Sequence, residues 1–199
     1  NNTAVGSLAL DASTTGIRQV AVGYGALGSN TTASYSTAVG YNALKSNTTG
    51  ASNVALGNGA GNENTTGGNN VAIGTVAMQS NTTGSSNTAV GRDALRDTTA
   101  SAYNVAIGYR SSFTGDQGSN NVAVGSFSLS QNTAANLVAI GYAALENNTS
   151  GSANVAVGLE ALEENTTASN NTAVGNRALQ NNTTGFNNTA VGSIALQDN

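Results

Sequence analysis

Asparagines in the sequence Asn-x-Ser/Thr recur along the chain and are the first residues whose spacing suggests chemistry. Such asparagines accept N-linked glycans, and acceptors in register would place sugars in a row along one edge. The same residues are typical of turns, because Asn and Thr side chains hydrogen-bond the local backbone and a following Gly allows a positive φ. The two roles are compatible, so we interpret these positions as turns and as candidate glycosylation sites. The candidates in a common 17-residue register, which is interrupted after Asn81 and then resumes, are Asn30, Asn47, Asn64, Asn81, Asn148, Asn165 and Asn182.

Four tyrosines each follow a glycine of the string Ala-aliphatic-Gly, which predicts that they share an edge or groove. Exposed aromatic rings stack on sugars or on partner proteins. Alternatively, the rings only cover the turn beside the glycine. The four candidate ligand contacts are Tyr24, Tyr41, Tyr109 and Tyr142.

The densest group of carboxylates is Glu160, Glu163 and Glu164, with Glu146 shortly before them. Carboxylates in this number can bind a hard cation such as calcium. However, no Asp recurs at a fixed spacing, as it does in calcium-binding β-rolls. We therefore interpret the cluster as a solvated edge and expect no metal site.

Catalytic machinery is not expected. The chain contains no His and no Cys, so it cannot assemble a Ser-His-Asp or a Cys-His nucleophile. The glycine-rich stretch 57–61 lacks the Lys-Ser/Thr and the βαβ setting of a phosphate-binding loop. The sequence therefore predicts neither an enzyme nor a cofactor.

The composition argues against several classes of protein, including ordinary compact domains and disordered chains. The 199 residues include 25 Gly but no Pro or Trp, and only 8% of them are charged. Few large apolar side chains are available for an ordinary compact core. Disorder is not favoured either, because the net charge is only −4 and β-branched residues recur at fixed positions. Six scattered basic residues do not indicate a nucleic-acid partner, and no stretch approaches the roughly 18 apolar residues of a membrane span.

A 17-residue repeat runs through the whole chain. Its marker is the glycine of Ala-Val/Ile/Leu-Gly, here numbered position 0. The consensus has Asn at −4, Thr or Val at −3, Ala at −2, an aliphatic residue at −1, Ala at +3 and Leu at +4. One interval, Gly125 to Gly141, is 16 residues long, which predicts a one-residue deletion in a loop at 131–136.

This repeat predicts an all-β fold, a parallel β-solenoid or β-roll of about twelve 17-residue coils that form a single repeat domain over residues 1–199. Each coil would contain a short strand before the glycine, a second short strand around Ala-Leu and a polar turn at Asn-Thr-Thr-Gly. We expect the aliphatic residue at −1 and the Leu at +4 to form columns inside. The Asn at −4 would form an amide ladder, and the Ala at −2 and +3 would form flat outer faces suited to packing between chains.

The strings NVAIG at 70–74 and 104–108 and NTAVG at 87–91, 171–175 and 188–192 resemble the head repeats of YadA-like trimeric autotransporter adhesins. Similar strings occur in phage tail fibres, and the resemblance covers essentially the whole chain. It implies a left-handed parallel β-roll, assembled as a homotrimer on a fibrous surface protein. We therefore expect an extracellular structural fibre or adhesin segment, on a cell or virion surface.

The expected partners are copies of the chain itself, in a homotrimer or an end-to-end filament, with surface glycans or a host surface as candidate targets. The alternative is a dedicated solenoid binding module for carbohydrate or ice. Ice binding would use a row of threonines that matches ordered water, with breaks expected at Thr98, at Gly115 and at the loop deletion. The row consists of Thr31, Thr48, Thr65, Thr82, Thr166 and Thr183.

Overall fold

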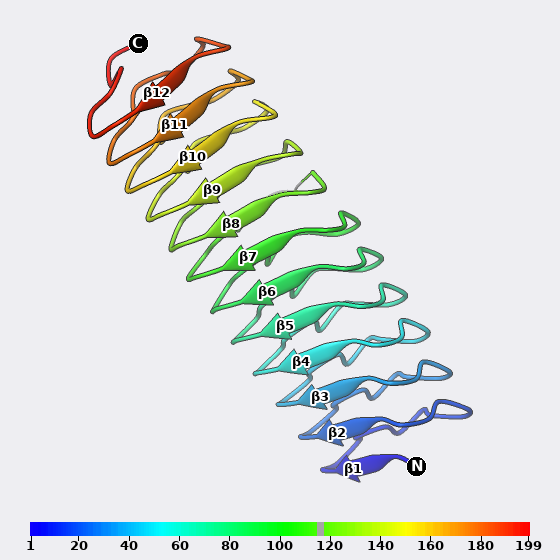
Figure 1. Cartoon of the computed structure of the whole chain (residues 1–199). Helices are drawn as coiled ribbons and strands as arrows, with labels where there is room; N and C mark the ends of the chain where they lie inside the picture. Colours follow the sequence, from blue (N-terminus) through cyan, green and yellow to red (C-terminus); the bar gives the residue numbers. More distant parts are fainter. Residues whose placement is uncertain (115–117) are drawn as a thin grey trace. The chain divides into compact units, whose positions relative to one another are not determined.

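The computed structural model describes residues 1–114 and 118–199, which form two compact units, 1–102 and 103–199. The position Gly115, where a break of the threonine row is expected, lies outside the described residues. Each unit is a β-solenoid whose three-residue strands lie side by side (Figure 1). The first unit contains β1 (Thr3–Val5), β2 (Val20–Val22), β3 (Thr37–Val39), β4 (Val54–Leu56), β5 (Val71–Ile73) and β6 (Thr88–Val90). The second contains β7 (Val105–Ile107), β8 (Val122–Val124), β9 (Val138–Ile140), β10 (Val155–Val157), β11 (Thr172–Val174) and β12 (Thr189–Val191).

Strands that follow one another within a unit pair in parallel, and equivalent repeat positions face each other. In β3 and β4, for example, Ala38 pairs with Ala55. The register survives the deletion, because Ala123 of β8 still pairs with Ala139 of β9. The predicted all-β parallel solenoid is therefore confirmed.

The deletion lies in the polar turn, as predicted. In a complete coil the turn asparagine donates from Nδ2 to the carbonyl oxygen three residues later, as Asn148 does to Gly151 at 2.9 Å. In the short coil Asn132 donates to Ala134, only two residues later, at 2.8 Å. The missing residue therefore corresponds to the second Thr of the turn, where no strand hydrogen bond depends on it.

The strands direct Ala inward and their larger residues outward, which is the reverse of our prediction. From Ala21 to Ala190 the Ala at −2 is at most 3% exposed, whereas Leu56 and Ile140 at −1 are 48% and 40% exposed. The Ala at +3 is also buried, so it does not form an outer face. A 17-residue coil encloses little space, and the Leu at +4 already fills most of it. The prediction for Leu is correct for the inner coils, where Leu27, Leu44, Leu95, Leu129, Leu145, Leu162 and Leu179 are buried, but Leu196 of the last coil is 52% exposed.

The second strand expected around Ala-Leu does not form. Positions +2 and +4 have positive φ in every described coil, for example 53° at Glu160 and 51° at Leu162. This left-handed conformation costs an L-residue about 1 kcal/mol. The N–H groups at these two positions bond to opposite neighbours: Glu160 donates to Tyr142 of the preceding coil and Leu162 to Ala178 of the following one. The N–H between them, of Ala161, donates to Gly158 within its own coil. Each coil thereby satisfies its backbone groups against both neighbours without a second extended segment.

Candidate functional site

The outward residues of the strands form an uncharged surface, which we call the strand face. It consists of the Thr or Val at −3 and the Val, Ile or Leu at −1 of each repeat. No charged residue occupies either position in any repeat. Within each unit the strand face is therefore a regular stripe of β-branched and aliphatic side chains, directed away from that unit's own core. Its most exposed members are Val5, Leu56, Ile107, Ile140 and Val191.

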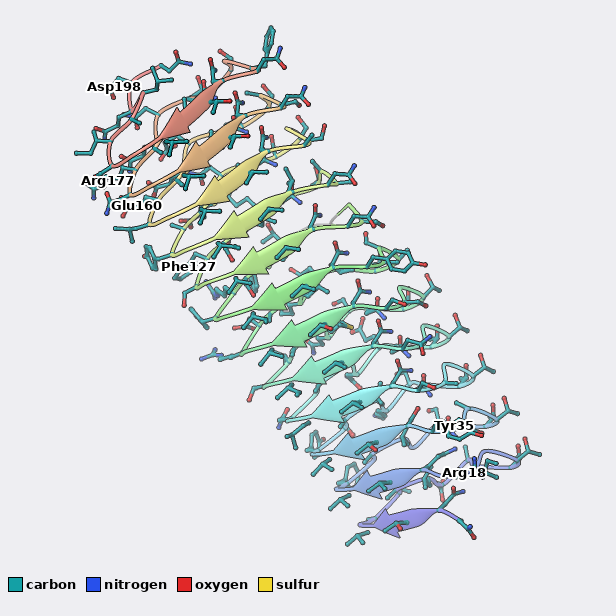
Figure 2. All side chains as sticks on the ribbon, viewed as in Figure 1. Arg18, Tyr35, Phe127, Glu160, Arg177 and Asp198 are labelled. Carbon is teal, nitrogen blue, oxygen red and sulfur yellow. The ribbon has the colours of Figure 1, made fainter. Side chains whose placement is uncertain are left out.

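Most charged residues lie in another part of each coil, which we call the variable segment: positions +1 to +6 after the repeat glycine. All charged residues except Arg18 and Asp116 fall in this segment. In the second unit, Figure 2 shows Glu160, Arg177 and Asp198 beyond the C-terminal ends of the strands. Arg177 and Glu160, from successive coils, form an ion pair at 2.7 Å between Nε and Oε2. The variable segment therefore carries a solvated surface whose residues differ from coil to coil.

The seven candidate sequon asparagines are buried and form the side-chain ladder of the fold. Asn64 donates from Nδ2 to Oδ1 of Asn47 at 2.7 Å and to the carbonyl oxygen of Gly67 at 2.9 Å. All seven candidate acceptors are at most 2% exposed. An N-glycan is attached through Nδ2, so a sugar there would have to displace the ladder. The folded coil thus leaves no room for glycans at Asn30, Asn47, Asn64, Asn81, Asn148, Asn165 and Asn182.

The asparagines at −4 are also buried, but they bond to backbone rather than to one another. The Oδ1 of Asn53 accepts the backbone N–H of Asn70 at 2.9 Å, and Nδ2 of Asn70 donates to the carbonyl oxygen of Gly84 at 2.8 Å. The amide ladder predicted at −4 was therefore assigned to the wrong column. Each of these asparagines instead links the start of a strand to the polar turn of the next coil.

The threonine row follows the sequon asparagines and is more continuous than the sequence suggested. Thr48 donates its hydroxyl hydrogen to the carbonyl oxygen of Thr65 at 3.0 Å, and Thr82 donates to Thr99 in the same way. Thr98 occupies the asparagine column, so the break expected there was wrong. Because each bonded hydroxyl proton is used between coils, such a threonine keeps only lone pairs for ordered water, which does not favour the ice-binding alternative.

The four candidate tyrosines are partly exposed, and each unit brings two of them together. In the first unit Tyr24 and Tyr41 stack with ring centroids 5.4 Å apart and an interplanar angle of 13°. In the second unit Phe127 lies between Tyr109 and Tyr142 and meets both rings edge to face, at 5.4 and 5.9 Å. The sequence did not reveal this role of Phe127, because it occupies +2 rather than +1. The Tyr24–Tyr41 pair is a parallel stack, whereas both contacts of Phe127 are edge to face.

The acidic cluster is held by neighbouring amides and a guanidinium. Gln180 donates from Nε2 to Glu163 at 2.7 Å and to Glu160 at 3.1 Å. Within residues 1–114 and 118–199, no group of three or more acidic side chains is placed to hold a metal ion. Partial burial raises the pKa of Glu146, and the charges of Glu163 and Glu164 raise it further.

We expect Glu146→Gln to raise the melting temperature at neutral pH. A raised folded-state pKa means that the ionised carboxylate disfavours the fold at pH values above that pKa. This penalty disappears as the pH falls below the ordinary Glu pKa of about 4.3, so the variant and the parent should then melt alike. Thermal melts from pH 3 to 8 test this. Gln180 occupies the equivalent position two coils later, which indicates that the coil accepts Gln. A constant difference at all pH values would contradict the prediction.

No helix in the described part of the chain is long and apolar enough to cross a membrane. Comparison with protein-family models, with curated proteins and with solved structures found no match to this chain.

Proposed function

We propose that this chain is a structural repeat segment that associates with copies of itself through the strand face. The observation that carries the proposal is the sidedness of each coil: nearly all charges lie in the variable segment, whereas the strand face is uncharged, mostly aliphatic and partly or fully exposed. Contiguous apolar surface of this kind is typical of protein interfaces. A second copy is the occupant that fits best, because the stripe repeats at the coil spacing and a parallel copy presents the same spacing.

The strand face lies along the side of the coils rather than at their ends, which favours lateral assembly over an end-to-end filament. A small closed oligomer, such as the homotrimer implied by the resemblance to YadA-like adhesin heads, would cover every strand face and leave the variable segments outside. The proposed role is then an extracellular fibre or adhesin segment that holds a rigid, repetitive surface. Many weak contacts on such a surface combine through avidity. The proposal includes no enzymatic activity.

Placing charge on the strand face tests this assembly. In analytical ultracentrifugation at micromolar concentration, we expect the parent chain to sediment as a defined oligomer and Leu56→Lys/Ile73→Lys to sediment as a monomer. Both replaced side chains point outward, so the coil itself should remain folded and its circular dichroism spectrum should not change. Burying two unpaired ammonium groups in the interface would cost several kcal/mol.

The matched control is Asn58→Lys/Thr75→Lys. It adds the same charge to the same two coils, two residues further along, in the variable segment. We expect this variant to keep the oligomeric state of the parent. A monomeric parent chain, or equal dissociation of both double variants, would contradict the proposal. A mass distribution that grows without limit as concentration rises would indicate a filament instead of a closed oligomer.

A further inference from the structure

A hollow of about 170 Å³ opens on the variable segment of the first unit. It exists because two glycines of the second coil replace side chains: Gly25 stands where the next coil has Asn42, and Gly28 stands where it has Lys45. None of the lining residues belongs to the strand face, so the proposed oligomer would leave the hollow open. Its principal lining residues are Leu8, Asp11, Tyr24, Gly25, Gly28 and Lys45.

The aromatic wall of the hollow is held in place. One face of the Tyr24 ring stacks on Tyr41 in the following coil. The equivalent position of the preceding coil is Ser7, whose side chain has no ring to cover the opposite face. Tyr24 is 46% exposed, so it offers an oriented apolar ring surface beside the space that the glycines leave.

Two exposed groups of opposite charge complete the lining: Asp11 supplies hydrogen-bond acceptors and Lys45 supplies donors. An anionic ligand would meet the Asp11 carboxylate, a cationic one would meet the Lys45 ammonium, and a purely apolar one would desolvate both groups without compensation. A neutral pyranose ring avoids all three costs. Its C–H face can stack on Tyr24, and its hydroxyl groups can donate to Asp11 and accept from Lys45.

We propose that this hollow binds one pyranose unit of a neutral saccharide, stacked on Tyr24. The small contact area predicts weak binding at a single site, with a dissociation constant on the order of 1 mM.

The test is saturation-transfer NMR of the full chain with the methyl glycosides of glucose, galactose, mannose and N-acetylglucosamine. We expect at least one glycoside to show saturation transfer and to bind about tenfold more weakly to Tyr24→Ala. The matched control is Tyr142→Ala, which removes a tyrosine from the same repeat position in the other unit and should leave binding unchanged.

A second variant keeps the test decisive if Tyr24→Ala fails to fold. Gly25→Asn/Gly28→Lys gives the second coil the two residues that the third coil carries at these positions. A Cβ at Gly25 would lie 2.5 Å from Oδ1 of Asn42, which is the movable end of a side chain. Filling the hollow in this way should abolish binding while the circular dichroism spectrum stays unchanged. Absence of saturation transfer for all four glycosides, undiminished binding to Tyr24→Ala, or binding that persists when the hollow is filled would overturn the proposal.

Discussion

Replacing Gly74 with Ala is expected to destabilise the first unit by about 3 kcal/mol or more. Gly74 has a φ of +131°, a conformation that L-residues rarely adopt. An added Cβ would also lie 2.5 Å from the carbonyl oxygen of Gly91 in the following coil and 2.6 Å from its carbon. Both of these atoms belong to backbone, so neither can move aside without separating the two coils. Urea denaturation followed by circular dichroism measures the loss.

Gly192→Ala separates the two causes of this loss. Gly192 has nearly the same φ, +128°, but the nearest atom to an added Cβ is the Cβ of Ala195 at 4.0 Å. This variant therefore carries the backbone strain without the collision, and we expect it to lose about 1–2 kcal/mol. Equal losses at Gly74 and Gly192 would show that close approach of the coils is not what requires the repeat glycine.

We expect Asn165→Ala to lower the free energy of unfolding by about 3 kcal/mol. The amide of Asn165 donates to Oδ1 of Asn148 at 2.7 Å and to the carbonyl oxygen of Ala168 at 3.1 Å, and it accepts from Asn182 at 3.3 Å. Truncation removes these bonds, leaves the buried Oδ1 of Asn148 without this donor and opens a small cavity. The same urea titration measures the effect.

Asn181→Ala is the matched control for the ladder. Asn181 is exposed, and its amide donates to Asp198 of the following coil at 2.6 Å. A solvated bond of this kind contributes little, so we expect a loss below about 0.5 kcal/mol. A loss at Asn165 no larger than that at Asn181 would mean that the buried ladder does not stabilise the stack.

The fold class could be predicted because the short residue pattern that produces it is repeated along the chain. Glycine and alanine recur every 17 residues, and only stacked coils bring equivalent positions together along a chain. The direction of the strand side chains was not predictable from alternation, since a period of two does not say which set is buried. One signal was present in the sequence. The residue at −2 is always Ala, whereas −3 and −1 vary among Thr, Val, Ile and Leu, as expected if only −2 faces a confined interior.

The properties of the candidate sites were even less predictable than the strand orientation, because they depend on contacts between coils. The sequence of a sequon is the same whether its asparagine is exposed or buried. Only the hydrogen bonds between Asn47, Asn64 and Asn81 of successive coils show that these amides are buried. In the same way, four tyrosines at one repeat position did not reveal that Phe127 joins two of them. The hollow beside Tyr24 depends on two glycines and on residues of three successive coils.

The amino-acid sequence by itself determined the period, the parallel stacking, the place of the deletion and the buried leucine column, because each follows from which residue types recur at which spacing. Only the tertiary structure decided which side of each strand is buried, which asparagines bond to each other and where the surface is hollow. These features depend on how much space one coil encloses and on which groups of the next coil fill it. That space is set by the left-handed backbone conformation at +2 and +4. Residue types such as Glu160 and Leu162 do not predict this conformation, because L-residues with side chains rarely adopt it.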